Sequence, residues 1–214
     1  MVVVREILTS LEKKRPIFHS EADFQHAFAW EIHQRLPDAS IRLELPIFIG
    51  HRALHLDIWV ATKGAGFAIE LKYKTRALKV QLGEEHFRLK NQSAQDIGRY
   101  DFIKDIQRLE QVVAKRENTV GYAIFLTNDS AYWAGKTQRQ TVDADFRLYQ
   151  GRILEGTLQW GAGASEGTKR SREEPLTLCG RYTVNWQRYS EVSNESYGLF
   201  RYLAIEIPKE QDAG

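Results

Sequence analysis

The 214-residue chain contains a single cysteine, Cys179. One cysteine cannot form an internal disulfide and cannot build a cysteine-based zinc site. A disulfide-rich protein and a protein with a cysteine-based zinc site are therefore both excluded. No run approaches the roughly 20 apolar residues that a membrane-spanning helix requires. The first 16 residues meet charge at Arg5 and Glu6 and therefore lack the apolar centre of a signal peptide. We expect a cytoplasmic protein with no membrane partner.

Charge of one sign is also scarce, because 30 basic residues face 28 acidic ones and the net charge is only +2. So mild a charge does not by itself indicate a nucleic-acid partner. Between Lys63 and Arg116, however, basic residues outnumber acidic ones, which would suit a surface that faces phosphates. A solvated surface of mixed charge explains this segment equally well. No glycine-rich phosphate loop is present, which disfavours an enzyme that acts on a small phosphate ester.

Hydrophobic periodicity predicts a helix over residues 3–14 and a second one that begins at Ser20. Asp23, three residues later, suits the capping of that second helix. The remaining predicted elements are a strand over 41–49 that is edged at Pro46, a helix over 93–115 and a buried central strand over 120–129. With the hairpin described below, the order is helix, three strands, helix, strand. This order predicts an α/β fold.

Beyond Tyr132 the sequence reads as short β segments separated by turns. We expect these segments to extend the same domain, so that residues 1–214 form one unit with a core of about 20–129. Residues 130–214 would then be a C-terminal β extension. The Gly-, Ser- and charge-rich stretch over 161–175 predicts a mobile loop within it.

The segment from Leu54 to Lys74 reads as a hairpin of two alternating strands. If Ala61 pairs with Gly66 across the loop TKGA, then Asp57 lies opposite Glu70. Directly opposed side chains point to the same face with Cβ atoms roughly 4.5–5.5 Å apart. The same register places Lys72 one step further along that face.

Two facing carboxylates repel each other unless a cation compensates them. Lys72 would compensate one of them, and a divalent cation would compensate both. Mg²⁺ binds a few carboxylate oxygens and keeps several waters, which suits Asp57 and Glu70. An ammonium beside such an ion would orient or deprotonate a water and would offset the charge that grows on a phosphate. An outward face of mixed charge is the alternative reading, and it explains each residue singly better than the aligned set.

Asp57, a short loop and the triplet Glu70-Leu71-Lys72 together resemble the PD-(D/E)xK nuclease superfamily, which includes restriction endonucleases and Holliday junction resolvases. The resemblance covers roughly residues 20–129. It implies a restriction-endonuclease-like αβββαβ core, with a mixed central sheet flanked by helices. Leu56 stands where the name of the motif has proline.

The resemblance also implies roles for individual residues. Asp57, Glu70 and the backbone carbonyl of Leu71 would bind Mg²⁺, for which Mn²⁺ substitutes, and Lys72 would assist the attacking water. Glu21 stands where many members carry a further acid on the first core helix. An acid in a first helical turn is equally well explained by the helix dipole, and Glu31 is the substitute candidate.

Four residues are candidates for contacts to nucleic acid: Lys74, Arg76, Gln95 and Arg99. Ordinary exposed polar side chains are the favoured alternative for each of them. The resulting hypothesis is a metal-dependent nuclease that hydrolyses phosphodiester bonds in DNA. RNA in place of DNA and homodimer formation are both left open. The alternative is a catalytically inactive module of the same fold that binds nucleic acid or a protein partner.

Overall fold

The computed structural model describes residues 4–49, 52–135 and 141–209. Its helices are α1 (Val4–Lys14), α2 (Glu21–Arg35), α3 (Gln95–Lys115) and the short α4 (Glu166–Lys169), and a 3-10 turn spans Ala144–Phe146. Its strands are β1 (Ser40–Ile49), β2 (Arg52–Ala61), β3 (Gly66–Lys74), β4 (Leu78–Leu82), β5 (Glu85–Leu89), β6 (Thr119–Thr127), β7 (Ile153–Leu158), β8 (Leu176–Thr183), β9 (Gln187–Glu191) and β10 (Leu199–Ile207).

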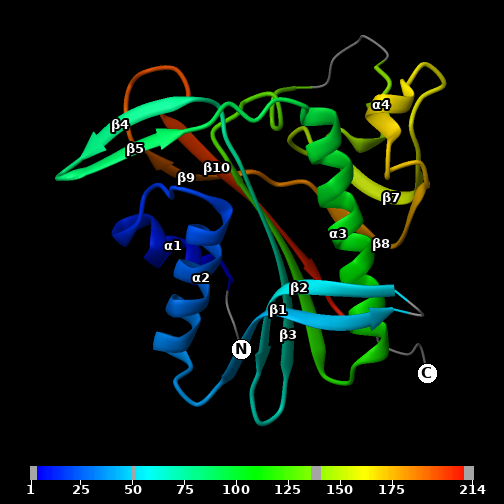
Figure 1. The fold of residues 1–214 in the computed structure, drawn as a ribbon. Coiled ribbons are helices and arrows are strands. Elements are labelled where there is room, and N and C mark those ends of the chain that lie inside the picture. Colours follow the sequence, from blue (N-terminus) through cyan, green and yellow to red (C-terminus); the bar gives the residue numbers. More distant parts are fainter. Residues whose placement is uncertain (1–3, 50–51, 136–140, 210–214) are drawn as a thin grey trace.

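Six strands form one mixed sheet in the order β1-β2-β3-β6-β10-β9. β3 and β6 run parallel, because α3 carries the chain across between them, and the other neighbours are antiparallel. Helices α1 and α2 cover one face of this sheet, and α3 covers the other (Figure 1). The predicted α/β class is therefore confirmed.

Each face of the sheet has its own hydrophobic core. Phe24 and Phe28 of α2 pack with Ile69 of β3 on one face. Ile106 and Leu109 of α3 pack on the opposite face, together with the hairpin of β7 and β8. The sheet is thus buried on both sides, which explains why β6 reads as an almost continuous apolar run.

Helix α2 begins as its sequence predicts. The Ser20 hydroxyl accepts a hydrogen bond from the Asp23 backbone N–H at 3.2 Å. The Asp23 carboxylate caps the N–H of His19, one residue earlier than a capping box requires, at 2.9 Å. These contacts fix the first turn of α2, where Glu21 lies.

A hairpin of β4 and β5 is inserted between β3 and α3, and the sequence analysis did not predict it. Its strands, LKVQL and EHFRL, alternate apolar and polar residues. Gly83, at φ +60°, occupies the first position of the two-residue turn, where a type II′ turn favours glycine. The hairpin projects from the body above α1 and α2 (Figure 1).

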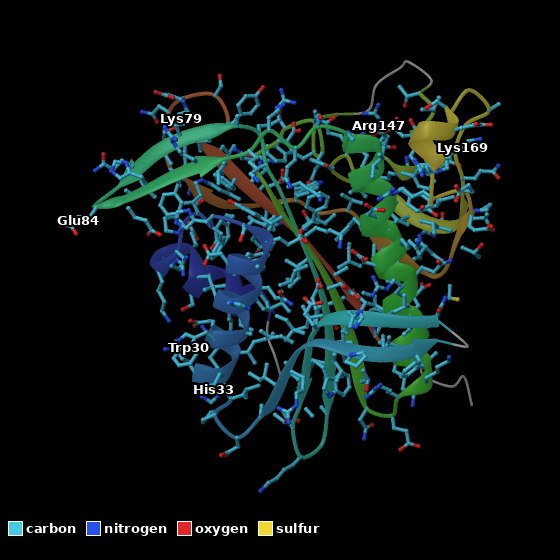
Figure 2. All side chains as sticks on the ribbon, in the orientation of Figure 1. Trp30, His33, Lys79, Glu84, Arg147 and Lys169 are labelled. Carbon is cyan, nitrogen blue, oxygen red and sulfur yellow. The ribbon has the colours of Figure 1, made fainter. Side chains whose placement is uncertain are left out.

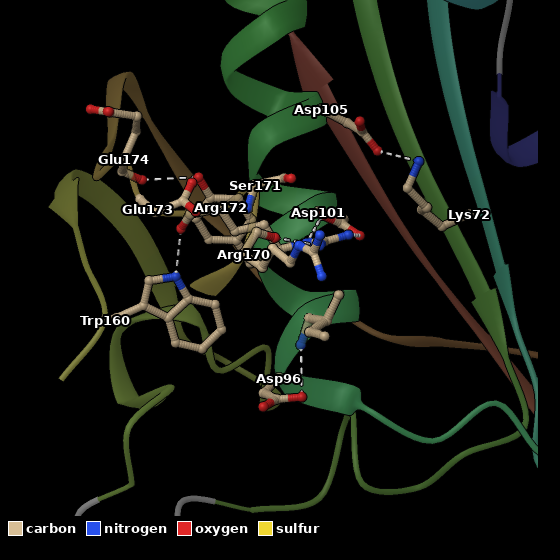
Figure 3. Close-up of polar contacts among 12 residues, drawn as sticks. Lys72, Asp96, Asp101, Asp105, Trp160, Arg170, Ser171, Arg172, Glu173 and Glu174 are labelled. Carbon is tan, nitrogen blue, oxygen red and sulfur yellow. Dashed lines mark hydrogen bonds and ion pairs between the residues drawn. The ribbon is translucent and has the colours of Figure 1, made fainter. Parts of the chain in front are cut away.

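The segments after Tyr132 divide between two places. Strands β9 and β10 extend the main sheet beyond β6, whereas β7 and β8 form a separate hairpin. Within 161–175, Arg172 pairs with both oxygens of Asp101 on α3 at 2.7 and 2.9 Å, and its carbonyl accepts from Trp160 (Figure 3). The mobility of this segment and the single-domain organisation stay predictions. Over residues 4–49, 52–135 and 141–209, no helix is both long and apolar enough to cross a membrane.

Candidate active site

Strands β2 and β3 separate just before the two acids of interest. The predicted register is present, since Ala61 pairs with Gly66 and the ladder continues as far as Ile58 opposite Ile69. The next pair in this register would be Asp57 and Glu70, but the ladder ends before it. The edge of β3 beyond Ile69 is therefore not covered by β2.

Two carboxylates contact the edge of β3 that β2 does not cover. Asp57 Oδ2 accepts a hydrogen bond from the backbone N–H of Leu71 at 2.6 Å. Glu21 Oε2, from the first turn of α2, accepts from the N–H of Tyr73 at 2.7 Å. In a strand, the N–H and C=O of one residue point to the same edge. The carbonyl of Leu71 therefore faces the same gap as these two acids.

The side chains of Glu70 and Lys72 point away from this strand edge, toward α3. Glu70 is only 2% exposed, and its Oε1 lies 3.0 Å from Nη2 of Arg108. Lys72 Nζ lies 2.6 Å from Oδ2 of Asp105 (Figure 3). Arg108 also pairs with Asp105, at 3.2 Å. Helix α3 thus supplies an acid and a base that contact the predicted triplet.

Asp105 and Arg108 are not among the site residues predicted from the sequence, although α3 carries a signal for the first of them. Asp105 lies three residues after Phe102 and four before Leu109, so it falls within the apolar stripe of the helix. A charged residue at such a position indicates a buried partner. The sequence does not say which partner, because Lys72 lies on a different element.

The cluster contains more acids than bases. Glu21, Asp57, Glu70 and Asp105 face Lys72 and Arg108. Burial raises the pKa of Asp57 to about 6, against the opposing effects of the Leu71 N–H and Lys72. Burial also raises the pKa of Glu70 well above its usual range, and the charges of Asp105 and Asp57 add to this effect. For both carboxylates, burial therefore outweighs the stabilisation that the neighbouring cations and the Leu71 N–H give to the charged form.

Lys72 stays protonated. Burial would lower the pKa of its ammonium, but the charge of Asp105 and the hydrogen bond to it outweigh burial and raise the pKa above its ordinary value. Burial likewise raises the pKa of Asp105, whereas Lys72 and Arg108 oppose that rise. The pair is thus held together in a largely desolvated place.

Two carboxylates and one backbone carbonyl are the groups at this place that could hold a metal ion. The described part of the chain contains no group of three or more His, Cys, Asp or Glu residues arranged around one point as metal ligands. Mg²⁺, however, is often held by one or two carboxylates together with waters and substrate phosphates. Asp57, Glu70 and the Leu71 carbonyl offer that set. Within the described residues, Glu70 Oε1 receives no well-directed hydrogen bond, despite the nearby Arg108.

Glu31, the substitute candidate for Glu21, is engaged in ion pairs on the helices α1 and α2. It is buried and forms ion pairs with Lys14 at 2.6 Å and with Arg35 at 3.2 Å. Of the two candidate acids on α2, only Glu21 contacts β3 at the edge where Asp57 lies.

The candidates for nucleic-acid contact occupy different environments. Arg99 is 3% exposed, pairs with Asp143 at 2.5 Å and donates to the carbonyl of Ala131 at 2.7 Å, so its guanidinium is engaged within the fold. Gln95 donates to Asp129 at 2.8 Å. Their proposed contacts to nucleic acid stay predictions, and the geometry favours a structural role for both.

Lys74 and Arg76 lie where β3 ends and the link to the β4–β5 hairpin begins. Arg76 is half-buried, donates to the hydroxyl of Tyr197 at 3.3 Å and lies over the ring of that residue. Lys74 is also half-buried and has no ion-pair partner within the described residues. Of the three charged candidates, Lys74 alone has a side chain with no ion pair, hydrogen bond or ring contact to the described residues.

Comparison of the chain with protein-family models, with curated proteins and with solved structures finds no match.

Proposed function

We propose that this chain is a metal-dependent nuclease that hydrolyses phosphodiester bonds in DNA. The observation that carries the proposal is the place where β2 and β3 separate. There, desolvated carboxylates from two adjacent strands gather in excess over the bases, beside an open strand edge. A solvated surface does not require this arrangement, and a fold without a ligand is destabilised by it.

Asp57, Glu70 and the carbonyl of Leu71 would hold Mg²⁺ or Mn²⁺, and Glu21 lies near enough along the same edge to assist them. A bound divalent ion would polarise a phosphate oxygen and lower the pKa of a bound water. The protein contributes the low exposure of Glu70 and the fixed position of Asp57, whose Oδ2 is held by the Leu71 N–H at 2.6 Å.

Lys72 acts as a charged hydrogen-bond donor in this proposal. Because Asp105 keeps the pKa of Lys72 above its usual value, the side chain is an ammonium and does not serve as a base near neutral pH. An ammonium can orient the attacking water and can stabilise the negative charge that develops on the phosphate. Asp105 positions Lys72 for both tasks.

The test is cleavage of supercoiled, linear and branched DNA by the purified protein with Mg²⁺ or Mn²⁺. Glu70→Gln should lower the rate by at least about 100-fold, because a ligand charge is lost where transition-state charge is stabilised. Asp38→Asn removes an exposed acid with no ion pair within the described chain and serves as the matched control. Intact DNA in all wild-type reactions, or equal rates for wild type and Glu70→Gln, would overturn the proposal.

One observation favours the inactive module as a second candidate. Glu70 is already paired with Arg108, and Lys72 with Asp105, so the cluster is partly neutralised by the protein itself. A protein that only binds nucleic acid or a protein partner needs no divalent ion. Calorimetric titration with Mn²⁺ separates the candidates, since only the nuclease requires a site that Asp57→Asn abolishes.

A further inference from the structure

The β4–β5 hairpin has one apolar face and one basic face. Leu78, Phe87 and Leu89 point inward and join the core beside α1 and α2. The alternating positions point outward and are all exposed: Lys79, Gln81, His86 and Arg88, followed by Lys90 directly after the strand. No acid belongs to this outer row.

Two like charges face each other directly in this hairpin. Lys79 is the cross-strand partner of Arg88, and the exposed Lys90 follows directly after β5, two residues beyond Arg88. Directly opposed like charges destabilise a strand pair. Within the described residues no acid forms an ion pair with any of the three. The arrangement therefore lacks a counter-charge that an external polyanion would supply.

The acids of the hairpin lie elsewhere. Glu84 is in the turn at the tip, which Figure 2 labels at the far end of the projecting arm. Glu85 belongs to the inward-facing row, where its carboxylate pairs with His19 at 2.8 Å while the His19 ring stacks on Phe87. The separation of charge between the two faces leaves the outer face positive.

The base of the hairpin is fixed close to the candidate active site. The Thr75 hydroxyl donates to the Lys90 carbonyl at 2.9 Å, and the Arg76 N–H donates to Asn128 at 2.8 Å, which ties the link to the end of β6. Lys79 lies only seven positions after Lys72 in the chain, so their Cα atoms are at most about 25 Å apart. That span is shorter than one turn of duplex DNA, about 34 Å.

We propose that the outer face of β4–β5 binds the sugar-phosphate backbone of duplex DNA next to the candidate active site. The choice of DNA as the polyanion rests on the proposed function. Lys79, Arg88 and Lys90 contact phosphates, which position a duplex without reading its sequence. The hairpin holds the duplex beside the carboxylates of Asp57 and Glu70.

The test compares two variants that lose the same charge. Lys79→Gln/Arg88→Gln removes two of the three basic charges of the outer face and leaves Lys90. The control, Lys63→Gln/Lys115→Gln, neutralises two exposed lysines at the opposite end of the sheet, in the β2–β3 turn and at the end of α3 (Figure 1). Binding to a fluorescent DNA duplex is followed by anisotropy in EDTA over a series of salt concentrations. The hairpin variant should bind about tenfold more weakly. The slope of log K against log salt concentration should also be smaller by about two in that variant, whereas the control should bind as wild type does.

Equal losses in both variants, no loss in the hairpin variant, or no duplex binding by wild type at low salt would each overturn the inference. Thermal unfolding checks that the hairpin variant is folded, and removal of the opposed charges should leave its midpoint unchanged or slightly higher. Lys90→Gln is a second, milder variant that should weaken binding in the same direction. If wild type cleaves no DNA with Mn²⁺ while binding still depends on the hairpin, the proposed function fails and this inference stands.

Discussion

Asp57 combines a structural hydrogen bond with an electrostatic cost. Its carboxylate accepts from the Leu71 N–H where the ladder has ended, yet burial raises its pKa to about 6. Asparagine can accept the same hydrogen bond without a charge. The charge of Asp57 therefore lowers stability, a cost that the proposed metal ion would offset.

Asp57→Asn should be more stable than wild type above pH 6. Between about pH 4 and pH 6 the folded protein retains a proton on Asp57 that the unfolded chain has released, so the free energy of unfolding falls as pH rises through this window. The shift corresponds to at most about 3 kcal/mol. Urea unfolding at pH 5 and pH 8 should show the variant gaining stability over wild type at the higher pH and losing cleavage activity. A variant less stable than wild type at pH 8 would contradict this assignment.

Lys72 and Asp105 should behave as a coupled pair. Asp105→Asn leaves the Lys72 ammonium without its counter-charge in a place where Lys72 is only 17% exposed, which should cost about 3 kcal/mol. The double variant Lys72→Met/Asp105→Leu should recover most of that stability but no activity. Urea unfolding of Lys72→Met, Asp105→Leu and their double variant measures the coupling. Additive effects would show that the two side chains do not interact.

At the scale of elements, the sequence predicted the hairpin of β2 and β3 and its register but not its end. Alternation specifies which residues share a face, so Asp57 and Glu70 could be aligned from the sequence. Alternation does not specify where β2 and β3 stop pairing, because the end of the ladder depends on the path of β2 relative to β3. Gln25 of α2, which donates to the Asp57 carbonyl at 2.8 Å, is one contact at that place.

Other elements were missed for different reasons. The alternation of β4 and β5 and the turn at Gly83 are present in the sequence, so this hairpin was predictable. The roles of Asp105 and Arg108 were not, because each depends on contact between α3 and β3 across the core. Pairings of this kind require the packing of elements that are distant in the chain.

Helix α3 is held in place by close packing at Gly98. A Cβ there would lie 2.3 Å from the hydroxyl of Tyr132, so Gly98→Ala must displace the ring or the helix. We expect a loss of roughly 1–3 kcal/mol in the free energy of unfolding, and lower activity because Asp105 moves with α3. Thermal and urea unfolding measure the loss. Gly64→Ala, whose Cβ meets nothing within 4 Å, is the control. Equal stability of the two variants would contradict this packing.

At the scale of the whole molecule, the last two strands, β9 and β10, are part of the main sheet. β10 pairs with β6 over seven residues, and Phe200 and Leu203 enter the two cores on opposite faces. The two cores therefore share β10, although more than 70 residues separate it from β6 in the sequence. The sequence predicted strands in this region, but not which of them would join the sheet.

A chain that ends at residue 150 should not fold cooperatively. It would expose the edge of β6 and remove the apolar side chains that β9 and β10 contribute to both cores. Thermal unfolding followed by circular dichroism should give one sharp transition for the full chain and none for the truncated one. A sharp transition for residues 1–150 would show that the C-terminal strands belong to a separate unit.

The most direct test of a metal-dependent nuclease is a crystal of the protein soaked in Mn²⁺ and measured for anomalous scattering. We expect a peak within coordination distance of the carboxylates of Asp57 and Glu70, with Arg108 displaced from Glu70, and no such peak in crystals of Asp57→Asn. An empty site in wild-type crystals at millimolar Mn²⁺, with Glu70 still paired to Arg108, would contradict the proposal and favour the inactive module.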